Sequence, residues 1–349
     1  MRYRGLLIIF FTLAICSCGS AHSSPHAKAV SPSFVRQKTT GHPSERELLL
    51  ARAASAWTRR TERLQLEEAI AYWRRAVALD ANDVDTWNRL SRAHAFWLEL
   101  LCISPPIPAN GDQMNAGVRK TSISEVEPRS NESAPLEVGT GECDSSEDAD
   151  GEDERRNARF EMLKQGIEAA EHALLLLSPS LIEQIEGVEN EHNVDLLVET
   201  NAVPSIFWRS TMMDEWARML GYAERIVHKH AVTASMTLCL NRDEHYYFAG
   251  PHRYFGTFYA RPLSPADKNL AKSKLHFERA VEIAPRFLAN RYTFARDYAV
   301  MAQDRQTFET QLRLVLEANP DDDPSTAPEN RVYQQKAERL FQQASDLFE

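Results

Sequence analysis

The chain has 349 residues, of which 43% are hydrophobic, and this is enough for one large domain or two moderate ones with buried cores. Its 50 Asp and Glu residues outnumber its 40 Lys and Arg residues, and the formal net charge of −10 argues against a nucleic-acid partner, which needs a basic face. The 13 glycines are too few for many tight β-turns, and long stretches rich in Leu, Ala, Glu and Arg favour an all-α fold.

The first 18 residues have the pattern of a lipoprotein signal peptide. Two arginines precede an apolar run over residues 6–15, which is shorter than the ~20 residues of a membrane-spanning helix. Cys18 is a better lipidation site than Cys16, because a small serine precedes Cys18 and a bulky isoleucine precedes Cys16. Since Gly19 follows, and not the Asp of inner-membrane retention, we expect a periplasmic protein anchored by lipid to the outer membrane. The alternative is an ordinary cleaved signal or an uncleaved anchor.

Residues 19–43 are rich in Ser, His, Pro and Lys, and they predict a flexible tether before a folded domain over residues 44–349. The remaining cysteines, Cys102, Cys143 and Cys239, are odd in number and match no zinc pattern. Two readings therefore stay open, a disulfide between Cys102 and Cys143 or free thiols at both positions.

The folded domain shows a repeated pattern typical of TPR-like helical hairpins. The clearest hairpin spans residues 66–98, with a turn at residues 80–83. Small side chains alternate there with larger ones that fill the adjacent holes: Ala69, Trp73 and Ala76 on the first helix, and Trp87, Leu90, Ala93 and Ala95 on the second. Other units end just before Pro179, Pro285 and Pro320, because proline cannot continue a helix. The irregular spacing predicts a divergent TPR-like bundle or superhelix.

The segment over residues 104–157 does not share this pattern. It contains no aromatic residue, and eight acids without a base fall between residues 142 and 154. So polar a segment cannot bury enough surface to fold, and we expect a disordered acidic insertion between hairpins. Calcium binding is not expected, because the EF-hand spacing is absent.

The C-terminal half carries an ordered set of short segments: VPSIFW at 203–208, GPHRYFG at 250–256, ARP at 260–262, FERAV at 277–281 and RDYAV at 296–300. In this order, and with the cysteine after the apolar run, they resemble the T-component (TatT) family of periplasmic lipoproteins associated with TRAP transporters. The resemblance spans about residues 45–349 without the acidic insertion. The chain departs from the family in that insertion and at residues 265–267, where a glycine-rich turn is commoner.

The resemblance implies a helical-repeat protein tethered in the periplasm. It also implies a homotrimer that docks the solute-binding protein of a TRAP system, with a hydrophobic channel through each subunit. A general TPR scaffold in the envelope, for protein–protein interaction or outer-membrane assembly, is the alternative function.

Residues 246–259 are unusually aromatic, and such a segment can form the wall of a ligand cavity. The candidates for a ligand channel are Trp208, Met212, Trp216, Arg253, Tyr254, Phe255 and Phe258. For each ring the alternative is ordinary core packing. An arginine among aromatics either pairs with an acid or contacts an anionic ligand, and for Arg253 structural pairing is favoured.

No catalytic signature is present: the sequence has no GxSxG, no P-loop, no GxGxxG and no HExxH. The histidines show no established ligand spacing, because His228 and His230 lie on different helix faces and His245 and His252 only flank the aromatic segment. We therefore expect no enzyme, no cofactor and no metal. A metal-dependent envelope enzyme using residues 245–252 is the third hypothesis.

Overall fold

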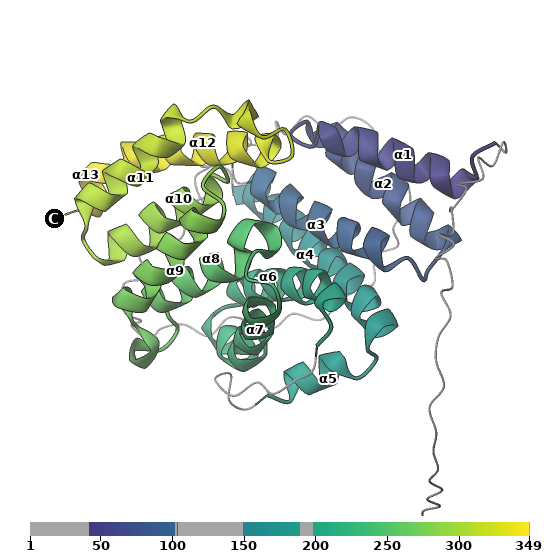
Figure 1. The fold of residues 1–349 in the computed structure, drawn as a ribbon, viewed down its shortest axis with the longest axis horizontal. Helices are drawn as coiled ribbons and strands as arrows, with labels where there is room; N and C mark the ends of the chain where they lie inside the picture. Colours follow the sequence, from purple (N-terminus) through teal and green to yellow (C-terminus); the bar gives the residue numbers. More distant parts are fainter. Residues whose placement is uncertain (1–41, 102, 104–148, 189–197, 349) are drawn as a thin grey trace, which may run out of the picture. The chain divides into compact units, whose positions relative to one another are not determined.

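The computed structural model describes residues 42–101, 103, 149–188 and 198–348. Within these residues the fold is all-α, with short 3-10 and π-helical turns and no strand, as the composition predicts. The described residues from Pro43 onward form one compact unit (Figure 1). The signal peptide, both lipidation candidates, almost all of the tether and residues 104–148 lie outside the described residues.

The N-terminal helices α1 (Glu45–Thr58), α2 (Arg63–Leu79) and α3 (Val84–Leu101) confirm the predicted hairpin. Ser44 begins α1 with a capping box, in which its backbone N–H donates to Glu47 and its hydroxyl accepts from the Glu47 N–H. Ala69, Trp73 and Ala93 are buried where the helices approach, as their spacing predicts.

Helix α4 (Ala149–Leu177) begins within the segment predicted as an insertion, so residues 149–157 belong to a helix. Its first residues are also the most acidic, which suits a helix N-terminus because the positive end of the helix dipole lies there. Helix α4 ends before Pro179, as predicted, and the short α5 (Leu181–Glu186) follows.

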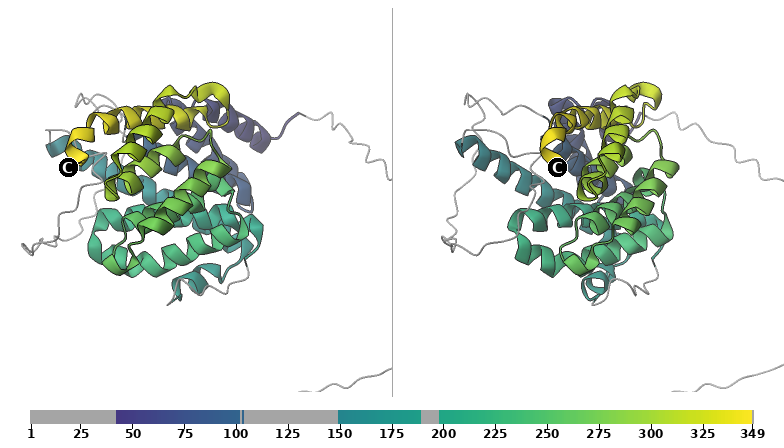
Figure 2. Two further views of the ribbon diagram at one scale, coloured as in Figure 1. Left: turned by 60° about the vertical axis from the view of Figure 1, so that its left-hand side comes forward. Right: turned by 90° about the vertical axis from the view of Figure 1, so that its left-hand side faces the viewer.

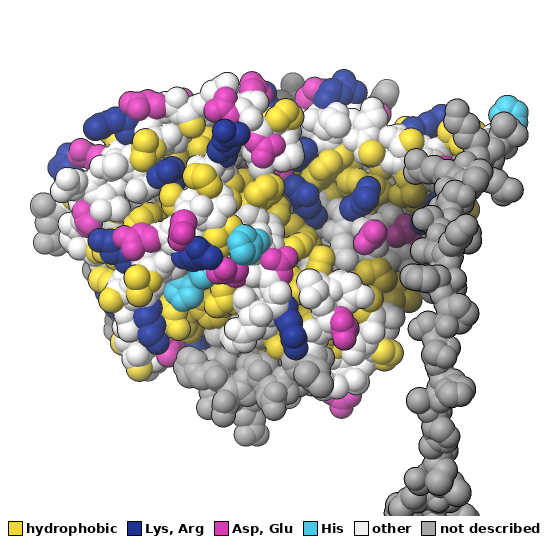
Figure 3. All heavy atoms as spheres, viewed as in Figure 1, with side chains coloured by type: hydrophobic (Ala, Val, Ile, Leu, Met, Phe, Trp, Pro, Cys, Tyr) yellow, Lys and Arg dark blue, Asp and Glu magenta, His cyan; other side chains and the backbone are white. Residues whose placement is uncertain are grey.

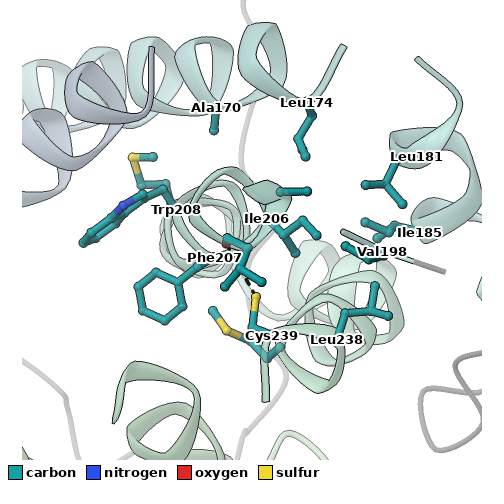
Figure 4. Close-up of a cluster of buried hydrophobic side chains, with 14 of the residues drawn as sticks. Ala170, Leu174, Leu181, Ile185, Val198, Ile206, Phe207, Trp208, Leu238 and Cys239 are labelled. Atoms are coloured by element: carbon teal, nitrogen blue, oxygen red, sulfur yellow. Dashed lines mark hydrogen bonds between the residues drawn. The ribbon is translucent and has the colours of Figure 1, made fainter. Parts of the chain in front are cut away.

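The middle of the unit consists of η1 (Thr200–Ala202), α6 (Val203–Leu220), α7 (Tyr222–Arg242) and α8 (Tyr246–Ala260). Gly221 alone joins α6 to α7, and its φ of 109° is a conformation that side-chain-bearing residues rarely adopt. Side chains of α4 to α8 form the largest apolar core, in which α6 lies at the centre (Figure 4).

The C-terminal part contains η2 (Pro265–Asp267), α9 (Leu270–Ile283), α10 (Ala289–Thr293), the π-helical η3 (Phe294–Ala299), α11 (Arg305–Glu317), η4 (Pro320–Asp322), α12 (Ala327–Gln342) and α13 (Ala344–Leu347). Helices α9 and α11 end before Pro285 and Pro320, as predicted. Phe277, Tyr292 and Phe308 are fully buried in a separate apolar cluster here.

Helix α12, near the C-terminus, contacts the N-terminal helices. Glu329 of α12 forms an ion pair with Arg60 in the α1–α2 turn, and Lys336 of α12 pairs with Glu99 of α3. Helix α12 accordingly lies beside the N-terminal helices in both orientations (Figures 1 and 2). Arg92 of α3, which also pairs with Glu329, lies against Tyr247 at the start of α8.

Candidate functional site

The start of α8 has an unusual backbone. Tyr247, Phe248 and Ala249 all lie in the left-handed region, with φ values of 45°, 56° and 63°. Each such residue costs roughly 1–2 kcal/mol, and non-glycine residues rarely visit this region in succession. The right-handed part of α8 begins after them, so Pro251 falls in a first helical turn, where its missing N–H does no harm. This left-handed turn needs compensating contacts.

Arg253 supplies those contacts. Its guanidinium donates to the carbonyl oxygens of Phe248 at 2.6 Å and of Tyr247 at 3.0 Å. It also donates to the Asn290 side-chain oxygen at 2.7 Å, and the Asn290 amide in turn donates to two carbonyls at the end of α9. Among the described residues Arg253 has no carboxylate partner, so the favoured pairing with an acid is wrong, and neutral oxygens of Tyr247, Phe248 and Asn290 take its place.

Glycine at position 250 allows the turn to sit close to α6. A Cβ atom there would lie 2.5 Å from the Phe207 ring, which is far inside van der Waals contact. The turn therefore packs directly against the core, and it cannot move outward without losing the Arg253 bonds.

Two side chains of the turn and three that pack on them form what we call the aromatic junction: Tyr247 and Phe248, with Phe287, Arg253 and Arg92. Tyr247 packs edge-on against Trp208 at 4.6 Å between ring centroids, and Phe248 stacks on Phe287 at 4.5 Å. The Arg92 guanidinium lies 5.2 Å from the Tyr247 ring, and that of Arg253 lies 4.9 Å from Phe287. Burial raises the pKa of Tyr247 to about 12, so its hydroxyl stays protonated.

A buried ion network borders the aromatic junction. Glu329 is 2% exposed and accepts from Arg60 at 2.5 and 3.2 Å and from Arg92 at 3.0 Å. Beside it, Glu99 accepts from Lys336 at 2.6 Å and from the Tyr333 hydroxyl at 3.2 Å. Burial opposes ionisation of Glu99, but Lys336 and Tyr333 outweigh it and lower the Glu99 pKa.

Six of the seven predicted channel residues lie in or against the apolar core around α6, and Arg253 holds the left-handed turn. Trp208 is buried in the core around α6 at 3% exposure (Figure 4). Met212 and Phe255 are buried in the same core, at 1% and 5% exposure. Tyr254 and Phe258 are half-buried and pack against the same core. Trp216 lies nearer the end of α6, where its ring contacts Phe160 of α4 and His228 of α7. Of these residues, Arg253 belongs to the aromatic junction, and Trp208 contacts it through Tyr247.

A cavity of about 500 Å³ lies elsewhere, between α2, α3 and α4. It contains none of the predicted residues; those that line it are Arg74, Val77, Ala78, Trp87, Leu90, His94, Glu161, Gln165, Glu168, Ala169 and His172. Trp87 and His172 stack at 4.6 Å on its wall, and burial lowers the pKa of His94 to about 3. The sequence showed Trp87 only as a packing residue, because its contact with α4 spans the insertion.

Hydrophobic side chains with Lys and Arg among them gather across the middle of the face shown in Figure 3, between α12 and α8 as placed in Figure 1. Among the described residues, no helix is both long enough and apolar enough to cross a bilayer. Cys239 is a buried free thiol, whose pKa is raised by burial, so it is not a reactive thiolate.

Comparison with known proteins places most of these helices in one family. The sequence model of the family described as TRAP transporter T-component (TAtT) matches residues 140–348, which include α4 to α13. The match is more than half of the chain, and α1 to α3 precede it. No curated protein matches the chain.

Proposed function

Because the chain belongs to the TRAP transporter T-component family, we propose that it is a non-enzymatic accessory protein that docks the periplasmic solute-binding protein of a TRAP transporter. The family is a transporter accessory component and not a known enzyme family, and membership implies association with TRAP transport in the cell envelope. The observation that carries this proposal is the match over residues 140–348, which contains the complete aromatic junction apart from Arg92.

Docking uses the helical surface around the cavity between α2, α3 and α4. This cavity has an aromatic wall at Trp87 and an ionic rim with Arg74 and Glu168, which suits a protruding side chain of a protein partner. Trp87→Ala and His172→Ala then weaken partner binding. His228→Ala is the control, because His228 lies on α7 and does not line the cavity.

A small ligand with apolar and anionic groups binds or passes at the aromatic junction. Two arginines lie there beside aromatic rings, and strained backbone concentrates at functional sites. Trp208 and Arg253 are the channel candidates that support this position, whereas passage along Met212 and Phe255 requires the core around α6 to open.

Anchoring through Cys18 holds the protein at the outer membrane, and three copies assemble as a homotrimer. Metabolic labelling with palmitate tests the first part: label should disappear in Cys18→Ser and persist in Cys16→Ser. Light scattering on residues 19–349 tests the second part, and a monomer mass would contradict it.

The docking function is tested by a pulldown from periplasmic extract with residues 19–349 as bait and mass spectrometry of what binds. A TRAP solute-binding protein, absent with an unrelated lipoprotein bait, supports the proposal. Outer-membrane assembly factors would favour the general scaffold, and an empty bait would contradict docking.

A further inference from the structure

A pair of histidines joins α8 to α9 away from the aromatic junction. His252 and His276 face each other with their Nδ1 atoms 3.0 Å apart. His252 is 8% exposed, and His276 is half-buried between the rings of Phe255 and Tyr259, at 5.4 and 5.7 Å between centroids. The pair is 24 residues apart in sequence, and only the α8–α9 packing brings it together.

The far side of His252 is fixed by a carboxylate. Glu244 Oε2 lies 2.9 Å from His252 Nε2, and Arg279 donates to Glu244 Oε1 at 2.7 Å. With Nε2–H donating to Glu244, the lone pair of His252 is on Nδ1 and points at His276. A carboxylate that orients the outer nitrogen of an imidazole is the usual second partner of a metal-binding histidine.

We propose that His252 and His276 bind a divalent transition-metal ion, such as Zn²⁺ or Cu²⁺, through their Nδ1 atoms. Two nitrogens that each lie about 2.0–2.1 Å from a tetrahedral zinc are roughly 3.3 Å apart, so the pair must open from 3.0 Å and both rings must turn until their Nδ1 lone pairs point at the ion. On binding, the proton of His276 moves from Nδ1 to Nε2, and no proton is released.

The chemistry of the pair selects the class of metal. Imidazole nitrogen suits Zn²⁺, Cu²⁺ and Ni²⁺, whereas Mg²⁺ and Ca²⁺ prefer oxygen ligands. No three His, Cys, Asp or Glu side chains form a ready cage among the described residues, so water or a partner's group completes the coordination.

The surroundings keep both imidazoles neutral, which is the form that binds metal. Burial, then His252 and Lys272, lower the pKa of His276 to about 4. Burial also lowers the pKa of His252, against the raising effect of Glu244, while Arg279 and His245 add to the lowering.

The test uses residues 19–349 without a polyhistidine tag and ZnCl₂ as the probe in a calorimetric titration at pH 7. We expect one Zn²⁺ per chain. His252→Ala and His276→Phe each abolish it, and Glu244→Gln weakens it by about 10–100-fold. His276→Phe keeps the stacking with Phe255 and Tyr259, so loss of binding there is not a loss of packing.

Electron paramagnetic resonance with CuCl₂ counts the ligands directly. The unmodified chain should show two coordinating nitrogens, and each single variant should show fewer. His228→Ala, a histidine on α7 that contacts Glu224, is the matched control and should bind as the unmodified chain does. Zn²⁺ binding that survives in both His252→Ala and His276→Phe, or no binding at all, would overturn the proposal and leave a plain N–H···N hydrogen bond.

Discussion

The α2–α3 hairpin and the start of α8 are both buried and aromatic, yet they are built in opposite ways. In the hairpin, regular helices meet through small residues such as Ala69 and Ala93, and an apolar cluster fills the space between them. At α8 the backbone is left-handed, the Arg253 guanidinium donates to its carbonyl oxygens, and the Arg92 guanidinium lies against the Tyr247 ring. The first region depends on neighbours in sequence, whereas the second depends on Asn290 and Arg92 from distant parts of the chain.

Because of this difference, we expect substitutions in the hairpin to destabilise the protein less than substitutions at the aromatic junction. A hairpin held by many apolar contacts loses stability in proportion to the group removed. A buried ion pair loses more, because removing one partner leaves the other charge buried without an opposite charge to offset its lost hydration. The aromatic junction should therefore be the most sensitive part of the unit.

The largest effect is expected from Glu329→Ala. It leaves Arg60 and Arg92 without their carboxylate in a buried site, and breaking such a pair costs about 3–5 kcal/mol of unfolding free energy. Urea unfolding followed by circular dichroism measures it. Glu309→Ala, which removes the exposed partner of Arg305, is the control and should cost less than about 1 kcal/mol. Equal costs for the two variants would remove the contrast.

The second-largest loss of unfolding free energy is expected at Asp297 in the π-helical η3, which should also make the stability depend on pH. Burial opposes its ionisation, but Arg296, Arg261 and Thr257 outweigh it and lower the Asp297 pKa. Because the folded pKa is below the unfolded one, the stabilisation is present above the ordinary aspartate pKa of about 3.9 and is lost as pH falls through the folded pKa.

Asp297→Asn should cost about 3 kcal/mol at pH 7, because two arginines lose their charge partner. It should also flatten the fall of unfolding free energy on acidification below pH 5. Chemical unfolding at several pH values measures both. An unchanged acid slope would show that Asp297 does not carry this pH dependence.

Arg253→Met tests the left-handed turn itself. The variant keeps the length of the side chain but removes the bonds to Tyr247 and Phe248, and we expect a loss of about 1.5–3 kcal/mol. The near-ultraviolet circular dichroism should change as well, since Tyr247 packs on Trp208. Arg305→Met, at an exposed position of α11, is the control and should leave the spectrum unchanged. An unaltered spectrum in Arg253→Met would mean that other contacts hold the turn.

The smallest effect belongs to the hairpin. Asp83 accepts from the Thr86 N–H at 3.1 Å at the start of α3, and an N-cap of this kind is worth about 1 kcal/mol. Asp83→Ala should lower the unfolding free energy by that amount, and Asp83→Asn by less, because the amide oxygen also caps. A loss above about 3 kcal/mol would show that this hairpin, too, depends on single polar contacts.

These two regions also mark what the sequence could predict. The hairpin, the all-α class and the helix ends before Pro179, Pro285 and Pro320 follow from local periodicity and from the missing N–H of proline. The sequence does not predict the start of α4 within the acidic segment, because the low hydrophobicity of residues 149–157 indicates disorder even though these residues form a helix.

The candidate site could be predicted only in part. The aromatic segment over residues 246–259 is visible in the composition, but the partners of Arg253 are not, because they are neutral oxygens and not the expected acid. The left-handed turn was not, since no glycine or asparagine occupies residues 247–249 to signal it. The His252–His276 pair and the contact of Trp87 with His172 depend on the packing of separate helices, which local patterns do not encode.

We propose that this family member docks a TRAP solute-binding protein, and direct binding between the two purified proteins tests this proposal most directly. Calorimetry of residues 19–349 with the solute-binding protein of the same organism's TRAP system should show saturable binding, weakened by Trp87→Ala and unchanged by His228→Ala. No heat and no complex in light scattering, with both proteins folded, would contradict the account.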